Sequence, residues 1–359
     1  MKIKAFTKYS YEGPSSRYRF YNYRECFNKK NIELEILPLF EKEYFEAQGK
    51  LNKLLIVFKS YLKRFLQLKN LKEKDVVLIE YELFPFFPAF YEKKLRKKGV
   101  KYLVDYDDAI FHRYDLNKNF LIKKFLRNKI KEVIKNASKV IVCNKYLENY
   151  AKKYNSNISI LHTVVLLDKY IEKSKKFKKN SNKFIVGWIG SRTTSKYILE
   201  ILPVFEKLKD LNIQFNLVGF DESLLDDEMK KKFNINVIPW REDTEIDNIL
   251  EFDVGIMPLD DTPWSRGKCG FKLIQYMSCK KPVIASPVGI NKDIVDENVG
   301  FLAENLEDWK KYIKKLYKDE KLRRKMGEKA FEKVLEKYNY EKNCEKYLNL
   351  IDEVIECAE

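Results

Sequence analysis

A glycine followed by cationic side chains opens the second half of the chain in a pattern that suits an anionic ligand. The apolar run 184–189 leads directly into Gly190, Ser191 and Arg192, and Lys196 follows. Glycine permits close approach of the backbone, and free N–H groups at a helix start favour an anion. We predict a diphosphate site here, although the Gly-x-Gly-x-x-Gly fingerprint is absent. An ordinary turn with solvated cations is the alternative.

Three further segments resemble the donor-binding core of glycosyltransferase family 4. They cover residues 253–259, 264–277 and 281–289. The resemblance extends over nearly the whole chain and is most specific from about 184 to 302. It implies a GT-B fold, in which two Rossmann-like domains face each other across a cleft. It also implies sugar transfer from a nucleotide donor, with retention of anomeric configuration and with no metal or other cofactor.

The chain departs from the Glu-x7-Glu motif of that family, whose first Glu lies near the sugar and whose second bonds the ribose. Alignment places Gln275 at the second position and Gly267 at the first. An amide still bonds hydroxyls, but glycine replaces no carboxylate. Lys268 and Lys272 would instead neutralise the leaving diphosphate, unless they are solvated lysines. The predicted donor site is Gly190, Ser191, Arg192, Lys196, Trp240, Gly267, Lys268, Cys269, Gly270, Phe271, Lys272 and Gln275.

Three carboxylates follow the strand-like run 102–105 in the first half. Asp105, Asp107 and Asp108 would lie at the carboxyl end of a strand, where a catalytic or acceptor-orienting acid belongs. Asp-x-Asp also resembles the metal site of the GT-A fold, but the repeated strand pattern favours GT-B. We therefore predict these three side chains and Lys268 as catalytic groups, with no metal site.

Other residues of the first half are candidates for the acceptor side. Gly13, Arg17 and Arg19 follow the first strand-like run, and Glu80 ends the third. His112 could act as an acid or base near neutral pH. A surface loop with incidental arginines and a structural histidine are the alternatives.

The elements that must position these residues form two similar series. Short apolar runs alternate with helical segments, which is typical of parallel sheets in an α/β protein. We predict strands at 3–6, 32–37, 76–80, 102–105, 140–144 and 158–162, then at 184–189, 215–218, 236–239, 254–257, 283–285 and 300–302. We expect an acceptor-binding domain over 1–172, a linker over 173–183, a nucleotide-sugar-binding domain over 184–340, and a helix over 341–359 that could cross back.

The positive charge is concentrated in one half of the chain. Residues 1–180 contain 41 Lys and Arg against 20 Asp and Glu, whereas the remainder is slightly acidic. Lysines also mix with apolar residues at helical spacing in 50–74 and 118–139. This predicts association with an anionic membrane surface, which suits a glycan or lipid-linked acceptor. A nucleic-acid-binding protein and a GT-B epimerase are the competing classes, but no nucleic-acid-reading motif is present.

The compartment is predicted from the start of the chain and from its cysteines. The first residues lack a secretory signal, so we expect a cytoplasmic protein, peripheral on the inner membrane face. Six cysteines show no Cys-x-x-Cys pair, which argues against structural zinc. We expect their thiols to be reduced.

Overall fold

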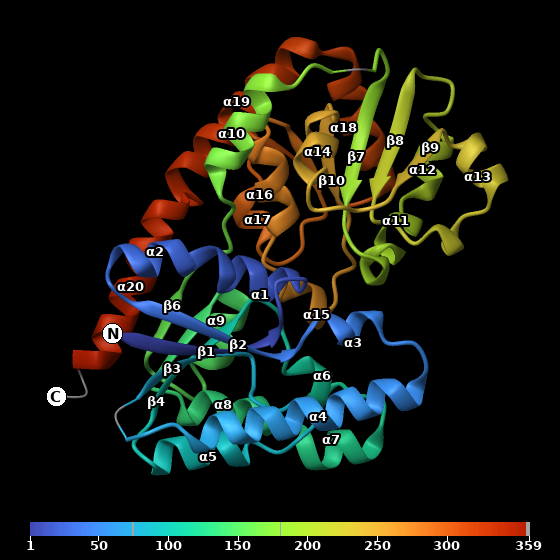
Figure 1. Cartoon of the computed structure of the whole chain (residues 1–359). Helices are drawn as coiled ribbons and strands as arrows, with labels where there is room; N and C mark the ends of the chain where they lie inside the picture. The colour runs from blue at the N-terminus through green and yellow to red at the C-terminus, as the bar shows by residue number, and fades with distance from the viewer. Residues whose placement is uncertain (74, 180, 357–359) are drawn as a thin grey trace. The chain divides into compact units, whose positions relative to one another are not determined.

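A computed structural model describes residues 1–73, 75–179 and 181–356 and divides the chain into two compact units. Unit 1 contains Met1–Thr163, Gly267–Cys269 and the described part of 341–359. Unit 2 contains Val164–Arg266 and Gly270–Tyr340. Each unit is built on one parallel six-stranded sheet flanked by helices (Figure 1).

The sheet of unit 1 has the strand order β2-β1-β3-β4-β5-β6. Its strands are β1 (Lys2–Tyr9), β2 (Glu33–Phe40), β3 (Val76–Glu80), β4 (Lys101–Tyr106), β5 (Lys139–Val142) and β6 (Ile158–Ile160). Its helices are α1 (Pro14–Arg19), α2 (Arg24–Lys29), α3 (Lys42–Glu46), α4 (Lys50–Lys69), α5 (Phe90–Lys97), α6 (His112–Asp115), α7 (Phe120–Leu126), α8 (Lys129–Asn136), α9 (Lys145–Ala151) and nearly all of α20 (Tyr340–Glu356), with the short 3-10 turn η1 (Tyr21–Tyr23).

The sheet of unit 2 has the order β12-β11-β10-β7-β8-β9. Its strands are β7 (Phe184–Ile189), β8 (Ile213–Val218), β9 (Ile235–Ile238), β10 (Val254–Met257), β11 (Val283–Ala285) and β12 (Gly300–Leu302). Its helices are α10 (Leu167–Lys176), α11 (Lys196–Leu199), α12 (Leu202–Glu206), α13 (Asp227–Lys232), α14 (Glu245–Leu250), α15 (Pro263–Arg266), α16 (Phe271–Ser278), α17 (Asn291–Ile294), α18 (Leu306–Lys318) and α19 (Glu320–Lys337), with 3-10 turns η2 (Arg192–Thr194) and η3 (Glu222–Leu224).

Each strand predicted from the sequence is confirmed, with bounds that differ by a few residues at most. The central strands are continuous apolar runs because helices cover both faces of a parallel sheet. In unit 2 the core surrounds Trp188, which is fully buried, and it includes Phe205 stacked on Phe215 at 3.6 Å between ring centroids. This packing fixes the carboxyl ends of the strands, where the candidate site lies.

The chain passes between the units earlier than predicted. The division falls between Thr163 and Val164, and α10 covers the first part of the predicted linker 173–183. Leu167 and Tyr170 on α10 are buried, so this helix packs into unit 2 despite the lysines that make its sequence look like a linker. The many lysines on the exposed face of α10 made the segment look like a polar linker, although its other face is apolar and buried.

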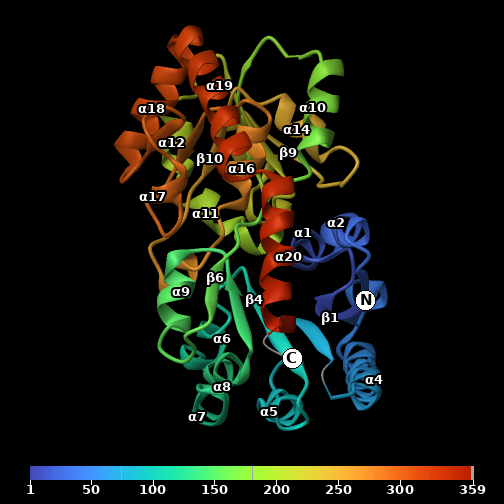
Figure 2. The same cartoon turned by 90° about the vertical axis from the view of Figure 1, so that its left-hand side faces the viewer.

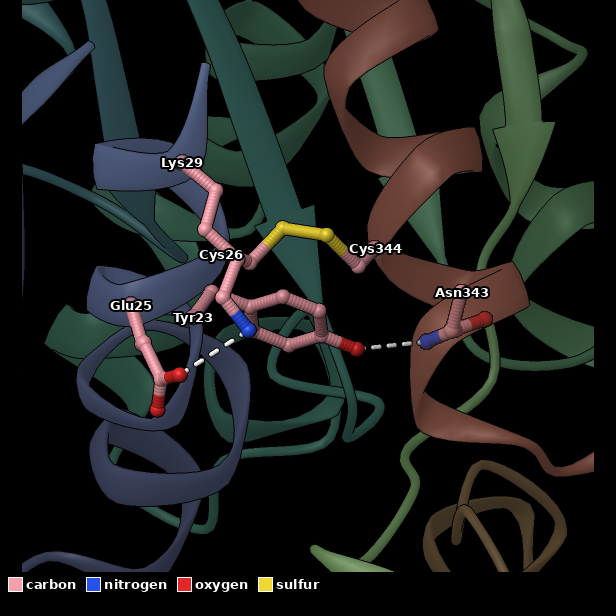
Figure 3. Close-up of a disulfide and its surroundings, with 6 residues drawn as sticks. All are labelled: Tyr23, Glu25, Cys26, Lys29, Asn343 and Cys344. Atoms are coloured by element: carbon pink, nitrogen blue, oxygen red, sulfur yellow. Dashed lines mark hydrogen bonds and ion pairs between the residues drawn. A yellow bond between two sulfur atoms is a disulfide. The ribbon is translucent and has the colours of Figure 1, made fainter. Parts of the chain in front are cut away.

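A disulfide joins Cys26 in α2 to Cys344 in α20 (Figure 3). The prediction that the thiols are reduced is therefore wrong for this pair, because docking of α20 on unit 1 brings together two cysteines separated by 318 positions. Cys143, Cys269 and Cys279 take part in no disulfide among the described residues, and Cys357 lies outside them.

Further contacts hold α20 against unit 1. The Nδ2 of Asn343 donates a hydrogen bond to the Tyr23 hydroxyl at 2.6 Å (Figure 3). It also donates to the His162 carbonyl at 2.8 Å. Tyr347 packs edge-on against Tyr23, at 5.2 Å between ring centroids. Figure 2 shows α20 running alongside the sheet of unit 1. The C-terminal helix is thus a structural part of the N-terminal unit.

Candidate active site

The turn after β7 is tightly packed around Gly190. A Cβ atom at this position would lie 2.3 Å from the Trp188 ring and 2.8 Å from the Thr194 hydroxyl, so only glycine fits. Ser191 and Thr194 cap the short η2 turn reciprocally. Arg192 is exposed at the start of this turn. The predicted anion-binding turn therefore has a fixed backbone and a cation at its tip.

Lys272, in the first turn of α16, reaches the same turn. Its Nζ lies 3.4 Å from the Thr194 hydroxyl and 4.5 Å from the centroid of the Trp188 ring. The structure thus brings together two regions that are 78 positions apart in sequence. Gly270 begins α16 with a φ of +69°, a left-handed conformation that glycine adopts without strain. Lys196 lies nearby in sequence, 3.9 Å from an Asp260 carboxylate oxygen and largely exposed.

Gln275 is buried and its amide is already engaged. Its Nε2 donates to a carboxylate oxygen of Glu245 at 2.7 Å and to the Tyr170 hydroxyl at 3.2 Å. The other oxygen of Glu245 accepts the indole N–H of Trp240 at 2.7 Å. The ring of Trp240 remains partly exposed at 36%. A carboxylate therefore sits between two predicted donor-site residues, and Gln275 holds it in place.

Gly267 and Lys268 belong to unit 1, together with Cys269. A Cβ atom on Gly267 would lie 2.4 Å from the Ala109 Cβ and 2.8 Å from its backbone nitrogen. No side chain fits there, which explains why a carboxylate is missing from this position. Asn144 donates to the Gly267 and Lys268 carbonyls at 3.1 and 2.9 Å, and so anchors the segment.

Lys268 and Asp108, both predicted as catalytic, form an ion pair. The Lys268 Nζ lies 3.1 Å from an Asp108 carboxylate oxygen, and the two side chains are 22% and 25% exposed. Asp107 is buried and accepts a hydrogen bond from the Tyr81 hydroxyl. Among the three predicted aspartates, Asp108 therefore has a carboxylate that is paired with a cation and is also accessible to solvent.

Asp105 and Arg19 form a buried pair instead of facing a ligand. Arg19 Nε and Nη2 donate to the two Asp105 oxygens at 2.9 and 2.7 Å, and its Nη1 donates to the Leu161 carbonyl at 2.8 Å. Burial lowers the pKa of Arg19, but Asp105 more than offsets this effect and raises it well above its usual value. In this structure the two charges tie α1 to β4 and to the residue that follows β6, which favours a structural role over the predicted catalytic role of Asp105 and acceptor role of Arg19.

Glu80 lies at the carboxyl end of β3 and is almost fully buried. One of its oxygens accepts the Lys8 backbone N–H at 2.7 Å and the Ser16 hydroxyl at 2.6 Å. Burial raises the pKa of Glu80 to about 7, although the Ser16 hydrogen bond opposes the shift. Burial also lowers the pKa of Lys8 to about 8, and Arg113 contributes. Glu80 thus titrates near neutral pH, next to the first strand.

The other predicted acceptor-side residues have local partners. Both ring nitrogens of His112 are engaged, one with Asp115 at 2.9 Å and one with the Tyr146 hydroxyl at 2.8 Å. Arg17 is buried with its guanidinium over the Tyr11 ring. Gly13 is required by packing, because a Cβ there would lie 2.5 Å from the Tyr9 Cβ. These contacts stabilise unit 1 around the carboxyl ends of its strands.

Sequence reasoning missed Glu245, Asn144 and Lys8. Glu245 is an acidic residue in the first turn of a helix, and Asn144 is an asparagine at a helix start. Both read as ordinary helix-end residues. Lys8 lies in β1, near the end of that strand, and could have been noticed by the same rule that selected Glu80.

Comparison with known proteins agrees with this architecture. Residues 169–333 match the family described as glycosyl transferases group 1. Two uncharacterised glycosyltransferases of Methanocaldococcus jannaschii are 27% identical over 58% of this chain and 26% identical over 74% of it. The matched regions span 57% and 72% of those relatives. The solved structure of a sucrose-phosphate synthase from Thermosynechococcus elongatus covers 99% of this chain and all of its own, with a TM-score of 0.75 at 15% identity.

Proposed function

We propose that this chain, whose residues 169–333 match glycosyl transferases group 1 and whose fold is of the GT-B type, moves a sugar from a nucleoside-diphosphate donor to a glycan or lipid-linked acceptor. The observation that carries the proposal is the meeting of Lys272 with the rigid turn around Gly190, beside Arg192. Backbone N–H groups and two cations at one turn are suited to a diphosphate.

The nucleoside would lie toward Trp240. Its partly exposed ring offers a surface on which a base can stack, and the carboxylate of Glu245 beside it can accept hydrogen bonds from ribose hydroxyls. Gln275 then acts as a positioning residue, since its amide is bonded to Glu245. A solved structural neighbour, Anabaena Alr3699/HepE, was crystallised with UDP and glucose, which makes uridine nucleotides the first ligands to test.

In the transfer step, the bond between the anomeric carbon and the diphosphate breaks while a bond from the acceptor oxygen forms. Arg192 and Lys272 would stabilise the negative charge that develops on the departing diphosphate. Asp108, held by Lys268 at 3.1 Å, is the carboxylate best suited to orient the acceptor hydroxyl and take its proton. We propose retention of configuration, and cationic side chains in place of a divalent metal.

A thermal-shift series tests the donor assignment. UDP, UDP-sugars, GDP and ADP are added to the wild type, to Arg192→Ala and Lys272→Ala, and to Arg324→Ala, which removes an exposed cation of α19 in the same unit. A ligand at about 100 times its Kd should stabilise the protein by roughly 2.7 kcal/mol. Loss of one charge-assisted hydrogen bond should raise Kd about tenfold or more, whereas Arg324→Ala should behave as wild type. No shift with any nucleotide would contradict the proposal.

We propose a peripheral place at the anionic inner face of the cell membrane, which the excess of cations in residues 1–180 supports. We propose no role in nucleic-acid binding, because the sequence contains no recognisable nucleic-acid-reading motif. None of the helices in the described residues is both long and apolar enough to cross a membrane.

An assay with and without a chelator tests the proposal that no divalent metal is needed. Activity that falls with the chelator and returns with manganese would refute the metal-free mechanism.

A further inference from the structure

One face of α4 carries large apolar side chains that are exposed rather than buried against the rest of unit 1. The helix is buried in unit 1 through Arg64 and Leu68. A separate strip of large apolar side chains, each 51 to 71% exposed, recurs at positions i, i+3, i+4, i+7, i+11 and i+15: Leu51, Leu54, Leu55, Phe58, Leu62 and Leu66. This spacing places them on one face along the whole helix. A helix of this length spans about 30 Å, so the strip is a long, narrow apolar surface.

Two neighbouring segments of unit 1 add exposed aromatic rings. Phe86, Phe87 and Phe90, at the start of α5 and just before it, are 44 to 59% exposed. In α7, Phe120, Leu121 and Phe125 are 61 to 71% exposed. Scattered exposed apolar residues are normal, but this many within one unit mark an interaction surface.

The three segments are joined by contacts within unit 1. The Tyr61 ring of α4 packs against Phe84 at 5.3 Å, and the Tyr61 hydroxyl donates to the Pro85 carbonyl. Phe86 packs against Tyr114 of α6 at 5.7 Å, and α6 leads into α7. In both views α4, α5 and α7 lie along the same end of unit 1 (Figures 1 and 2). We call these apolar residues of α4, 86–90 and α7 the α4–α7 surface.

The segments that carry α4 and α7 contain charges of a single sign, although Lys63 is paired with Glu41 outside them and Arg64 is buried. Residues 47–72 include six lysines and one arginine but no acidic residue, and the same absence of Asp and Glu holds for 116–131. A second copy of the chain docked here would place these cations against each other, which disfavours association. Apolar side chains flanked by cations instead match a bilayer that carries anionic headgroups.

We propose that the α4–α7 surface inserts into the headgroup region of an anionic bilayer, with α4 in the membrane plane. The apolar strip enters the acyl boundary, while the lysine ammonium groups reach the lipid phosphates. Membrane insertion would bring the protein to a lipid-linked acceptor, so the biological role of this surface rests on the proposed function. The binding itself requires neither donor nor acceptor, so it can be measured separately.

The test is co-sedimentation of the full chain with vesicles of phosphatidylcholine alone and of phosphatidylcholine with about 30% phosphatidylglycerol. The variant Phe58→Ser with Leu62→Ser removes two exposed side chains of α4. The matched control, Leu224→Ser with Leu335→Ser, removes two exposed leucines of unit 2, which are 40% and 41% exposed. We expect partitioning onto anionic vesicles to fall about tenfold or more for each inserted side chain lost. The control should partition as wild type.

A second variant addresses the charges. Lys50→Gln with Lys59→Gln should weaken binding to anionic vesicles roughly fivefold per lysine. Wild-type binding that is equal on neutral and anionic vesicles would overturn the proposal, and so would unchanged binding of Phe58→Ser with Leu62→Ser. The proposal is also overturned if that variant turns a wild-type dimer into a monomer in sedimentation velocity without any vesicle binding. UDP-induced thermal shifts on the same variants separate failure here from failure of the donor assignment.

Discussion

Replacing Asp105 with asparagine tests whether this aspartate is a structural partner of Arg19 or an acid that acts on substrate. Asparagine keeps the shape of the side chain and removes its charge. The guanidinium of Arg19, which is 1% exposed, would then remain buried without the carboxylate that it bonds, since its other hydrogen-bond partners are the Leu161 carbonyl and the Thr163 hydroxyl and the charge of Asp107 has a smaller effect on it. An uncompensated buried charge is strongly unfavourable.

The expected loss of stability is large. Removing one partner of a buried pair lowers the free energy of unfolding by about 3–5 kcal/mol. For a unit of roughly 150–250 residues, each kcal/mol corresponds to about 2–4 °C in Tm, so Tm should fall by about 6–20 °C. Arg19→Met combined with Asp105→Leu removes both charges and supplies apolar volume, so the double variant should recover much of this loss.

Thermal unfolding followed by circular dichroism measures the effect. Asp352→Asn, at an exposed position of α20 in the same unit, is the matched control and should leave Tm unchanged. Transfer activity is measured at a temperature where every variant is folded. If Asp105→Asn unfolds at the wild-type temperature but loses transfer activity, Asp105 is a catalytic acid and the structural interpretation is refuted.

Two other predictions concern unit 1. Because the disulfide closes a long loop, reduction of the wild type or Cys26→Ser should cost about 2–5 kcal/mol of stability in urea unfolding, and reductant should have no further effect on Cys26→Ser; equal stability with and without reductant would count against a formed bond. Burial raises the pKa of Glu80 from 4.5 to about 7, so between these pH values the native state binds more protons than the unfolded state. The free energy of unfolding should therefore fall by up to about 3 kcal/mol as pH rises from 4.5 to 7. Glu80→Gln should flatten that fall between pH 4.5 and 7.5, and an unchanged slope would contradict the assignment.

The strands and the fold class were readable from local sequence. A strand covered on both faces must be a continuous apolar run, and the length of the helical segments between such runs requires parallel crossovers. The tight turn at Gly190 was readable for a similar reason, since a glycine directly after a strand is typical of a close backbone turn, whereas its use for an anion stays a prediction. These features depend on neighbours along the chain, which the sequence displays.

Partners in space decided the chemistry of the remaining residues. Gln275 reads as a ribose ligand until Glu245, 30 positions away, is seen to hold its amide. Gly267 reads as a lost carboxylate until Ala109 is seen to occupy the space of a side chain. Asp105 and Arg19 read as active-site charges until 86 positions of chain fold back and bury them together. The sequence shows the residue types. Which partner each side chain bonds or pairs with depends on the tertiary structure, because those partners lie far away along the chain.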